Sequence, residues 1–384
     1  MKIAIFTDTF LPQVNGVTVG TASLVENLPK HEFLIIAPKP SGKISWKPKN
    51  CKLAFVSPWL TLPTYKDYKF CFFLHPKVWN QVREFKPDIV LAQTPFFVGA
   101  VGKNFAKKFK IPLIGAYNTL LPDFLMYLPL PLVKNTAFAK NAAWSFGNSF
   151  YSKCDLIIAP SNAMLSALKA HGLKAKTRKI PYGINEEFFK AGKKAKKNSR
   201  FFKLAFMGRL SFEKNIETVV KAFAVLEKKF PELRLAIIGD GPARRTLEVL
   251  AQDLGVKEKT EFAGMLSSKA LAERMASCDL FVTASTIETQ GISTFEAMAA
   301  GLPAIAADYL ANPEAVRDGF NGLLFKPFSV EDCAGKIEKI LRDKKLYSKL
   351  SKNAVKFAEG FKWKKVAREF EKAFKKSAKK SFKY

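Results

Sequence analysis

The sequence contains few of the residues that build zinc sites or disulfide frameworks, with five cysteines and three histidines among 384 residues. The cysteines are odd in number and widely scattered, no Cys-x-x-Cys pair occurs, and the histidines are equally dispersed. These spacings do not favour a metal site or a set of disulfides. We therefore expect no metal site, and buried free thiols in a reducing cytosol.

The sequence also lacks a long apolar run and an N-terminal secretory signal. Its most apolar stretch, residues 112–133, is interrupted by Asp123 and three prolines, so it would make a poor transmembrane helix. Residues 1–6 have the pattern of a strand rather than of a signal peptide. These features predict a cytoplasmic protein without a membrane-spanning segment.

Acidic residues are scarce relative to basic ones: 63 Lys and Arg against 33 Asp and Glu give a formal net charge of +30. A surface this basic attracts polyanions, so nucleic acid and an anionic membrane are both candidate partners. No RNA-recognition, helix-turn-helix or zinc-finger pattern occurs, which argues against nucleic acid. An anionic membrane surface stays a candidate partner of the basic N-terminal half.

The C-terminal segment, residues 361–384, interleaves aromatic and aliphatic residues with ten Lys or Arg and two Glu. This composition predicts an amphipathic basic helix. Such a helix either packs its apolar face on the protein core or lies on a membrane. The two interpretations are compatible, because only the lysine face has to touch lipid.

Short apolar runs alternate with helical patterns along the chain. Strands are expected at residues 2–6, 32–37, 88–92, 112–116 and 156–159 and, after the pattern restarts, at 204–207, 233–238, 260–263, 280–282 and 304–306. This alternation is typical of a parallel sheet with helices on both faces. We predict an α/β protein of two doubly wound, Rossmann-like domains facing across a cleft. The expected bounds are 1–184 and 204–384 with a basic linker at 185–203, and the final helix is able to cross back onto the first domain.

Ligands of open α/β sheets bind beyond the carboxyl ends of the strands, so the loops there are the places to search. Asn15 and Gly16 follow the first expected strand and precede a helix, where backbone N–H groups could approach a phosphate. An ordinary Asn-Gly turn is the alternative. Arg209 and Lys214 follow Gly208 on the first loop of the second domain and could hold a diphosphate. An ordinary charged surface loop fits their spacing equally well.

The most specific signal is a pair of glutamates, Glu288 and Glu296, eight positions apart with Gly291 between them. We expect Glu288 on a loop, a helix N-terminus at Gly291, Ile292 and Ser293, and Glu296 about one turn inside the helix. N–H groups at a helix N-terminus suit a phosphate, and carboxylates accept hydrogen bonds from sugar hydroxyls. A helix stabilised by acidic residues near its start is the alternative.

These residues carry a resemblance to a known family. Glu288, Glu296 and the Ala-Met-Ala-Ala-Gly-Leu-Pro run that follows resemble the signature of the GT-B family-four retaining glycosyltransferases. Other segments match the same family in order: the Asn15-Gly16 loop, Pro181-Tyr182-Gly183-Ile184-Asn185 with Phe188, Gly208-Arg209 with Glu213-Lys214, Gly239-Asp240-Gly241, and Glu314 with Asn321-Gly322-Leu323. The resemblance covers nearly the whole chain and is closest in motif to diacylglycerol glucosyltransferases and related lipid glycosyltransferases.

The resemblance implies transfer of a sugar from a nucleotide-diphosphate donor, with the first domain binding the acceptor and the second the donor. Arg209 and Lys214 would hold the diphosphate, Glu288 the donor sugar and Glu296 the ribose hydroxyls. The other implied donor contacts are Asn15, Gly16, Gly208, Gly239, Gly291, Ile292 and Ser293. Stabilisation of a leaving group by fixed cations and N–H donors requires no metal and no cofactor, and the chain lacks the Asp-x-Asp triplet of metal-dependent glycosyltransferases.

Asn118 departs from the family, which usually has a histidine there at the border of the donor sugar. An amide keeps hydrogen-bonding capacity but cannot become a cation or a strong base. In retaining transfer the leaving phosphate is thought to accept the acceptor's proton, so loss of the imidazole need not abolish activity. A non-catalytic sugar-nucleotide binder is the alternative.

The acceptor implied by the resemblance is a membrane lipid such as diacylglycerol, with glucose from a UDP-sugar as the first donor candidate. Apolar residues 120–133 could cover acyl chains, and a buried helix and loop is the alternative. Each Lys or Arg near an anionic leaflet contributes about 1 kcal/mol to docking. We therefore expect a peripheral enzyme on the cytosolic face of the cell membrane. Phosphatidylinositol or a polysaccharide precursor, with a GDP- or UDP-sugar, is the alternative pair of substrates.

Overall fold

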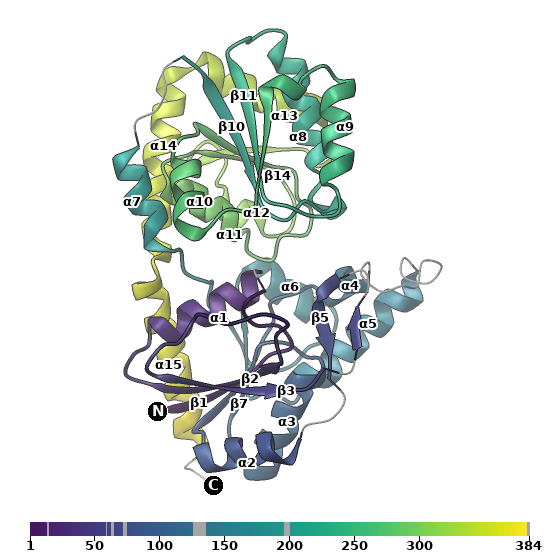
Figure 1. The fold of residues 1–384 in the computed structure, drawn as a ribbon, viewed down its shortest axis with the longest axis vertical. Coiled ribbons are helices and arrows are strands. Elements are labelled where there is room, and N and C mark those ends of the chain that lie inside the picture. The colour runs from purple at the N-terminus through teal and green to yellow at the C-terminus, as the bar shows by residue number, and fades with distance from the viewer. Residues whose placement is uncertain are drawn as a thin grey trace. The chain divides into compact units, whose positions relative to one another are not determined.

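The computed structural model describes residues 1–13, 15–58, 60–62, 65–71, 75–125, 136–195 and 200–381. The chain divides into two compact units, one formed by Met1–Gly183 with Trp363–Tyr384 and the other by Ile184–Lys362. Each unit is an α/β domain built on a parallel sheet with flanking helices (Figure 1). The predicted fold class, two Rossmann-like domains, is confirmed.

The sheet of the first unit is built around the N-terminal strand. In chain order its strands are β1 (Lys2–Phe6), β2 (Glu32–Pro38), β3 (Cys51–Val56), β6 (Ile89–Ala92), β7 (Leu113–Ala116), β8 (Leu156–Ala159) and β9 (Thr177–Lys179). Across the sheet their order is β3-β2-β1-β6-β7-β8-β9. β1 pairs in parallel with β2 and β6, and it is apolar throughout its buried length because both of its faces are covered. β4 (Leu60–Leu62) and β5 (Tyr65–Phe70) form a separate antiparallel hairpin.

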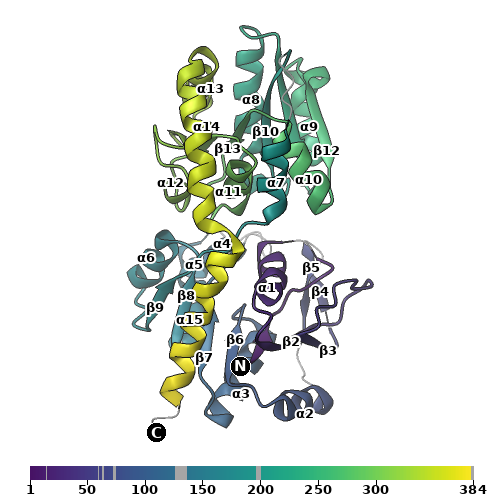
Figure 2. The same cartoon turned by 90° about the vertical axis from the view of Figure 1, so that its left-hand side faces the viewer.

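Helices connect these strands, and one further helix joins the unit from the far end of the chain. They are α1 (Gly16–Glu26), α2 (Pro76–Phe85), α3 (Phe97–Phe109), α4 (Leu121–Phe124), α5 (Ala137–Tyr151), α6 (Asn162–Ala170) and α15 (Trp363–Ser381). α15 contacts α1 and β6 (Figure 2). Val366, Phe370 and Phe374 form its buried stripe, whereas Lys372 and Lys375 are exposed. The predicted amphipathic helix is confirmed and its apolar face packs on the core, while membrane contact by its lysine face stays a prediction.

The sheet of the second unit begins after the basic segment. Its strands are β10 (Phe202–Met207), β11 (Leu233–Ile238), β12 (Thr260–Gly264), β13 (Leu280–Thr283), β14 (Ala304–Ala307) and β15 (Gly322–Phe325), ordered β12-β11-β10-β13-β14-β15 across the sheet. The helices are α7 (Glu186–Lys194), α8 (Ile216–Glu227), α9 (Arg244–Asp253), α10 (Ser268–Ala276), α11 (Ile292–Ala299), α12 (Asn312–Ala315), α13 (Val330–Arg342) and α14 (Lys344–Ala358). Short 3-10 turns η2 (Phe212–Lys214), η3 (Lys257–Lys259) and η4 (Glu359–Phe361) complete the unit.

Much of the expected linker is a helix. α7 occupies residues 186–194, where a solvated linker was expected from the run of lysines. The expectation fails because Phe188 and Phe189 are buried in the core of the second unit, while Asn185 caps the helix through a 3.0 Å hydrogen bond from the Glu187 N–H. The lysines lie on the solvent side of an anchored helix.

The apolar segment proposed to cover acyl chains is described only in part. Residues 126–133 of that segment lie outside the described residues, and residues 121–124 form α4. Among the residues that the structure describes, no helix is both long enough and apolar enough to cross a membrane.

Candidate functional site

Most predicted site residues lie on loops at one edge of the second unit's sheet. Arg209 and Lys214 follow β10, Gly239 follows β11, and Glu288 follows β13. These three strands are neighbours and run in parallel, so their carboxyl ends meet at the same edge. The sequence prediction that these residues belong to one edge of a sheet is confirmed for the second unit. Asn15, Gly16 and Asn118 belong to the first unit.

Lys214 and Glu288 form an ion pair although 74 positions separate them along the chain, with 2.6 Å between Lys214 Nζ and Glu288 Oε1. Their side chains are only 20% and 15% exposed. Burial opposes ionisation of Glu288, but the charge of Lys214 and its hydrogen bond outweigh burial and lower the pKa of the carboxyl. The pair therefore presents a fixed cation beside a fixed carboxylate at neutral pH.

Asn215 holds the loop that carries Lys214 against the loop after β13. Its side-chain amide donates to the Ala284 carbonyl oxygen at 3.3 Å and to Thr286 Oγ1 at 3.2 Å. Its backbone has a φ of 50°, a left-handed conformation in which asparagine is enriched. Sequence reasoning missed this residue, although an asparagine directly before a helix was a usable signal.

The loops after β10 and β11 touch backbone to backbone. The Gly208 N–H donates to the Ile238 carbonyl oxygen at 3.0 Å. A Cβ atom on Gly239 would lie 1.9 Å from the Gly208 carbonyl oxygen, so only glycine fits. The structure thus gives both glycines a packing role, and their contact with a donor stays a prediction.

The helix N-terminus expected at Gly291 is confirmed. Gly291 has a φ of 77° and precedes α11, which begins at Ile292, and no side chain caps this end of the helix in the described part of the chain. N–H groups of the first turn have no partner within their own helix, and the helix dipole adds partial positive charge there. Ile292 and Ser293 therefore contribute backbone donors suited to an anion.

Two buried oxygen atoms flank the same glycine. A Cβ atom on Gly291 would lie 3.5 Å from Thr294 Oγ1 and 3.8 Å from Asn312 Oδ1. Neither oxygen has a hydrogen-bond partner among the described residues. The amide nitrogen of Asn312 donates to the carbonyl oxygens of Ser285 and Ala307, each at 2.9 Å, which fixes its orientation. Buried acceptors of this kind are usually satisfied by water or a ligand, and sequence reasoning did not identify Asn312.

Glu296 lies one turn into α11 and is half-buried. Desolvation raises the pKa of its carboxyl to about 8. At neutral pH this carboxyl is mostly protonated, so it can both donate and accept a hydrogen bond. That suits a pair of adjacent hydroxyl groups.

Replacing Glu296 with glutamine is expected to remove one source of pH-dependent stability. The folded protein keeps the proton up to about pH 8, whereas the unfolded chain releases it above 4.5. Between these values Glu296 lowers the free energy of unfolding by about 1.4 kcal/mol for each pH unit. The variant should therefore gain stability relative to the parent as the pH rises from 5 to 8, with no further gain above 8. Thermal unfolding at pH 5, 7 and 9 measures this gain, and an unchanging difference would contradict it.

Asn15 caps the N-terminus of α1. Its side-chain oxygen accepts hydrogen bonds from the N–H groups of Val17 at 3.1 Å and Thr18 at 3.0 Å. Its amide donates to Thr9 Oγ1 at 2.9 Å. These contacts make Asn15 a helix cap, and Gly16 is the exposed first residue of α1.

Asn118 belongs to a hydrogen-bond network at the carboxyl edge of the first unit's sheet. Its amide donates to Gln93 Oε1 at 2.8 Å, and the Tyr182 hydroxyl donates to the same oxygen at 3.0 Å. Gln93 and Asn118 follow the neighbouring strands β6 and β7. Sequence reasoning missed Gln93, which is 1% exposed, and a polar residue directly after a buried strand was the available signal.

Comparisons with known proteins agree with this geometry. The family profiles "Glycosyltransferase Family 4" and "Glycosyl transferases group 1" match residues 14–188 and 186–357. Alpha-monoglucosyldiacylglycerol synthase of Streptococcus pneumoniae is 29% identical over 350 residues, which are 88% of this chain and 77% of that protein. GDP-mannose-dependent alpha-mannosyltransferase of Corynebacterium glutamicum is also 29% identical, over 84% of this chain and 76% of that protein.

A solved structure shows the same fold. The crystal structure of Anabaena Alr3699/HepE in complex with UDP superimposes with a TM-score of 0.76 at 19% identity, covering 98% of this chain and 100% of that chain. The sheet topologies of the two units, the two adjoining profiles and the alignments along most of the chain lead to one assignment. The chain belongs to the glycosyltransferases of the GT-B fold, with a Family 4 domain followed by a group 1 domain.

Proposed function

We propose that this glycosyltransferase moves a hexose from a nucleotide-diphosphate sugar to a membrane lipid, with retention of anomeric configuration and without a divalent metal. Glucose, UDP and diacylglycerol are the first candidates for the sugar, the donor nucleotide and the acceptor. The observation that carries the proposal is the ion pair of Lys214 with Glu288 at the carboxyl edge of the second unit's sheet. It combines a cation for a phosphate with a carboxylate for a sugar hydroxyl.

Each side chain of this edge has a role in the proposal. An ammonium group has three N–H donors, so the bond from Lys214 to Glu288 leaves donors for a diphosphate. Arg209 lies on the same loop and adds a second cation, while the first turn of α11 adds backbone donors. Glu288 binds the hydroxyls of the sugar and Glu296 those of the ribose. Together these groups stabilise the charge that develops on the departing diphosphate.

The lipid acceptor is supported by the Streptococcus pneumoniae relative, whose name describes a synthase of a glucosylated diacylglycerol. The net charge of +30 is compatible with binding to an anionic membrane surface. The exposed lysines of α15 could share in this contact, since its apolar face is already buried. The enzyme would then be peripheral on the cytosolic face of the cell membrane.

A second donor class is favoured by the Corynebacterium glutamicum relative, whose name specifies GDP-mannose. Asn118 replaces the histidine that the family usually has at the border of the donor sugar, so the choice of donor sugar is open on this ground as well. The alternative is therefore transfer from a GDP- or UDP-sugar to phosphatidylinositol or a polysaccharide precursor.

The experiment combines purified protein with UDP-glucose or GDP-mannose and with vesicles that contain diacylglycerol or phosphatidylinositol. Mass spectrometry detects new glycolipids, and Glu288→Ala is the inactive control. We expect a hexosyl-diacylglycerol from UDP-glucose that is absent with Glu288→Ala. A product formed from GDP-mannose alone would overturn the donor assignment. Donor hydrolysis without any glycolipid would overturn the lipid acceptor.

A further inference from the structure

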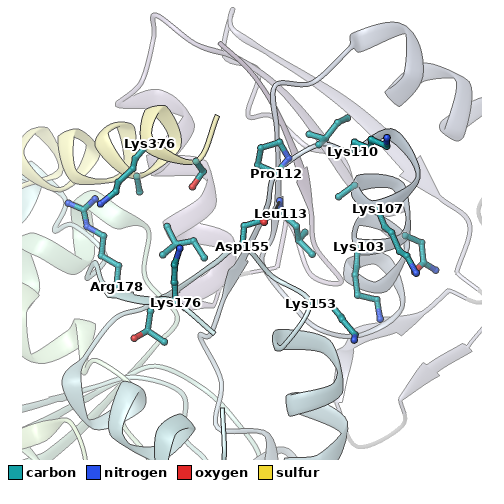
Figure 3. A pocket seen from close by; sticks show the side chains of 17 residues that line it. Lys103, Lys107, Lys110, Pro112, Leu113, Lys153, Asp155, Lys176, Arg178 and Lys376 are labelled. Atoms are coloured by element: carbon teal, nitrogen blue, oxygen red, sulfur yellow. Dashed lines mark hydrogen bonds between the residues drawn. The ribbon is translucent and has the colours of Figure 1, made fainter. Parts of the chain in front are cut away.

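A cavity of about 1240 Å³ lies in the first unit at the amino-terminal edge of its sheet (Figure 3). Its wall is formed by the starts of β7 and β8, by β9, by the second half of α3 and by the last turns of α15. We call it the amino-edge cavity. No residue predicted from the sequence to bind donor or acceptor lines it.

The amino-edge cavity is separate from the network around Asn118. Pro112 and Leu113, at the start of β7, line the cavity, whereas Asn118 lies two residues beyond the end of that strand. A strand rises about 3.3 Å per residue, so the four residues of β7 place the two sites roughly 13 Å apart. The cavity therefore requires its own explanation.

The lining of the cavity is strongly basic. It contains six lysines and Arg178 against a single carboxylate, Asp155. The carboxylate is already engaged, because Asp155 Oδ2 accepts a 2.8 Å hydrogen bond from the Leu113 N–H. Arg178 is engaged as well, since its guanidinium donates to Glu369 Oε2 at 2.6 Å. The lysines dominate the remaining charge.

Five of the six lysines, all but Lys110, form no ion pair with a described residue. They come from four different segments of the chain and are Lys103, Lys107, Lys153, Lys176 and Lys376. Figure 3 shows Lys107 on α3 and Lys376 on α15 on opposite sides of the cavity, with Lys176 and Asp155 between them. Cations gathered around one concavity repel one another and focus a positive potential within it.

The favourable placement of cations at helix C-termini explains only part of this arrangement. Lys107 lies in the last turn of α3, where a cation stabilises the negative end of the helix. Lys153 directly follows the C-cap of α5 and is explained in the same way. Lys176 lies outside any helix, directly before β9, so a helix end does not explain its place at the cavity. The excess of cations indicates a multiply charged anion.

We propose that the amino-edge cavity binds a ligand that carries several phosphate charges. Lysine ammonium groups form charge-assisted hydrogen bonds with phosphate oxygens. The volume exceeds what one phosphate fills and is ample for a small-molecule ligand, and Ile111, Pro112 and Leu113 offer apolar surface to its body. A free polyphosphorylated molecule and the clustered headgroups of anionic lipids share this chemistry. The proposal does not rest on the proposed sugar transfer.

The soluble arm of the test titrates the full-length protein with inorganic tripolyphosphate by calorimetry in physiological salt. Lys153→Glu with Lys176→Glu reverses two lining charges, and Lys43→Glu with Lys47→Glu makes the same charge change at exposed positions outside the cavity. We expect the first pair to weaken binding about tenfold, because each reversal replaces an attraction by a repulsion. The control pair should change it less than about twofold. Equal weakening by both pairs would overturn the proposal.

The lipid arm measures flotation with phosphatidylcholine vesicles that contain or lack phosphatidylglycerol. If lipid headgroups are the source, the double variant Lys153→Glu with Lys176→Glu, the cavity pair, loses binding to the anionic vesicles. The double variant Lys43→Glu with Lys47→Glu, the control pair, keeps this binding, and tripolyphosphate competes with the vesicles for the parent protein. If the source is a free phosphate compound, only the calorimetric difference is observed. Absence of both effects in correctly folded variants would overturn the proposal. Donor hydrolysis without vesicles should be unchanged in the cavity pair, which separates this test from that of the proposed function.

Discussion

Replacing Lys214 with methionine is expected to lower kcat/KM for sugar transfer by about 10²- to 10³-fold. A loss of this size is typical when one fixed hydrogen-bond donor to the charge of the transition state is removed. Methionine keeps much of the side chain's apolar length and removes only the ammonium group. The loss should appear in both KM and kcat, because Lys214 holds the diphosphate of the bound donor and the departing diphosphate carries still more charge. Steady-state transfer and nucleotide release both measure it. Lys221→Met is the matched control, since Lys221 is exposed on α8 of the same unit and should keep full activity.

The same substitution should also destabilise the protein through Glu288. Without Lys214 the carboxyl remains desolvated without its cation, so its pKa rises. Removing one member of a buried pair is costly, whereas removing both is much less so. The double variant Lys214→Met with Glu288→Gln should therefore melt at a higher temperature than Lys214→Met alone while staying inactive. A double variant no more stable than the single one would show that the pair has no energetic coupling.

Replacing Gly239 with alanine is expected to destabilise the second unit by about 3 kcal/mol or more. The new Cβ would lie 1.9 Å from the Gly208 carbonyl oxygen, which belongs to backbone and cannot turn aside as a side chain can. Gly239 also has a φ of 133°, a conformation that alanine rarely adopts. The loops after β10 and β11 would have to separate. Chemical denaturation measures the loss, and donor binding should weaken with it.

Gly335→Ala is the matched control for this prediction. Gly335 lies inside α13, and a Cβ atom there would meet no heavy atom within 4 Å. Alanine is a better helix former than glycine, so this variant should gain about 0.8 kcal/mol. Gly239→Ala as stable as the parent protein would contradict the close backbone contact.

The elements that the sequence predicts well are those with one strong local pattern. The buried strand β1 and the start of α11 at Gly291 both follow from short-range signals, an apolar run and a glycine before a helix. In the parallel sheet of the first unit, β3 and β9 were missed. β3 alternates buried and exposed residues after a lysine-rich loop, and β9 has three residues, of which two are basic. Their place at the edges of the sheet permits this composition.

The place of the candidate site residues on loops and a helix start was predictable from the sequence, whereas their contacts were not. The spacing of Glu288 and Glu296 pointed to the loop and helix that the structure shows. The pairing of Lys214 with Glu288 joins residues 74 positions apart, and no local pattern encodes it. The network of Gln93, Asn118 and Tyr182 likewise depends on how three separate segments meet. The lysine run after Asn185 was misleading, because two buried phenylalanines outweigh its charge.

The most direct test of the central claim is hydrogen exchange measured by mass spectrometry, with and without a nucleotide sugar that calorimetry has shown to bind. The loops that carry Arg209, Lys214 and Glu288, together with the start of α11, should exchange more slowly when the donor is bound. Lys214→Met should lose this protection, and Lys221→Met should keep it. Protection confined to other segments, while the donor binds, would contradict the placement of the donor at the carboxyl edge of the second unit's sheet.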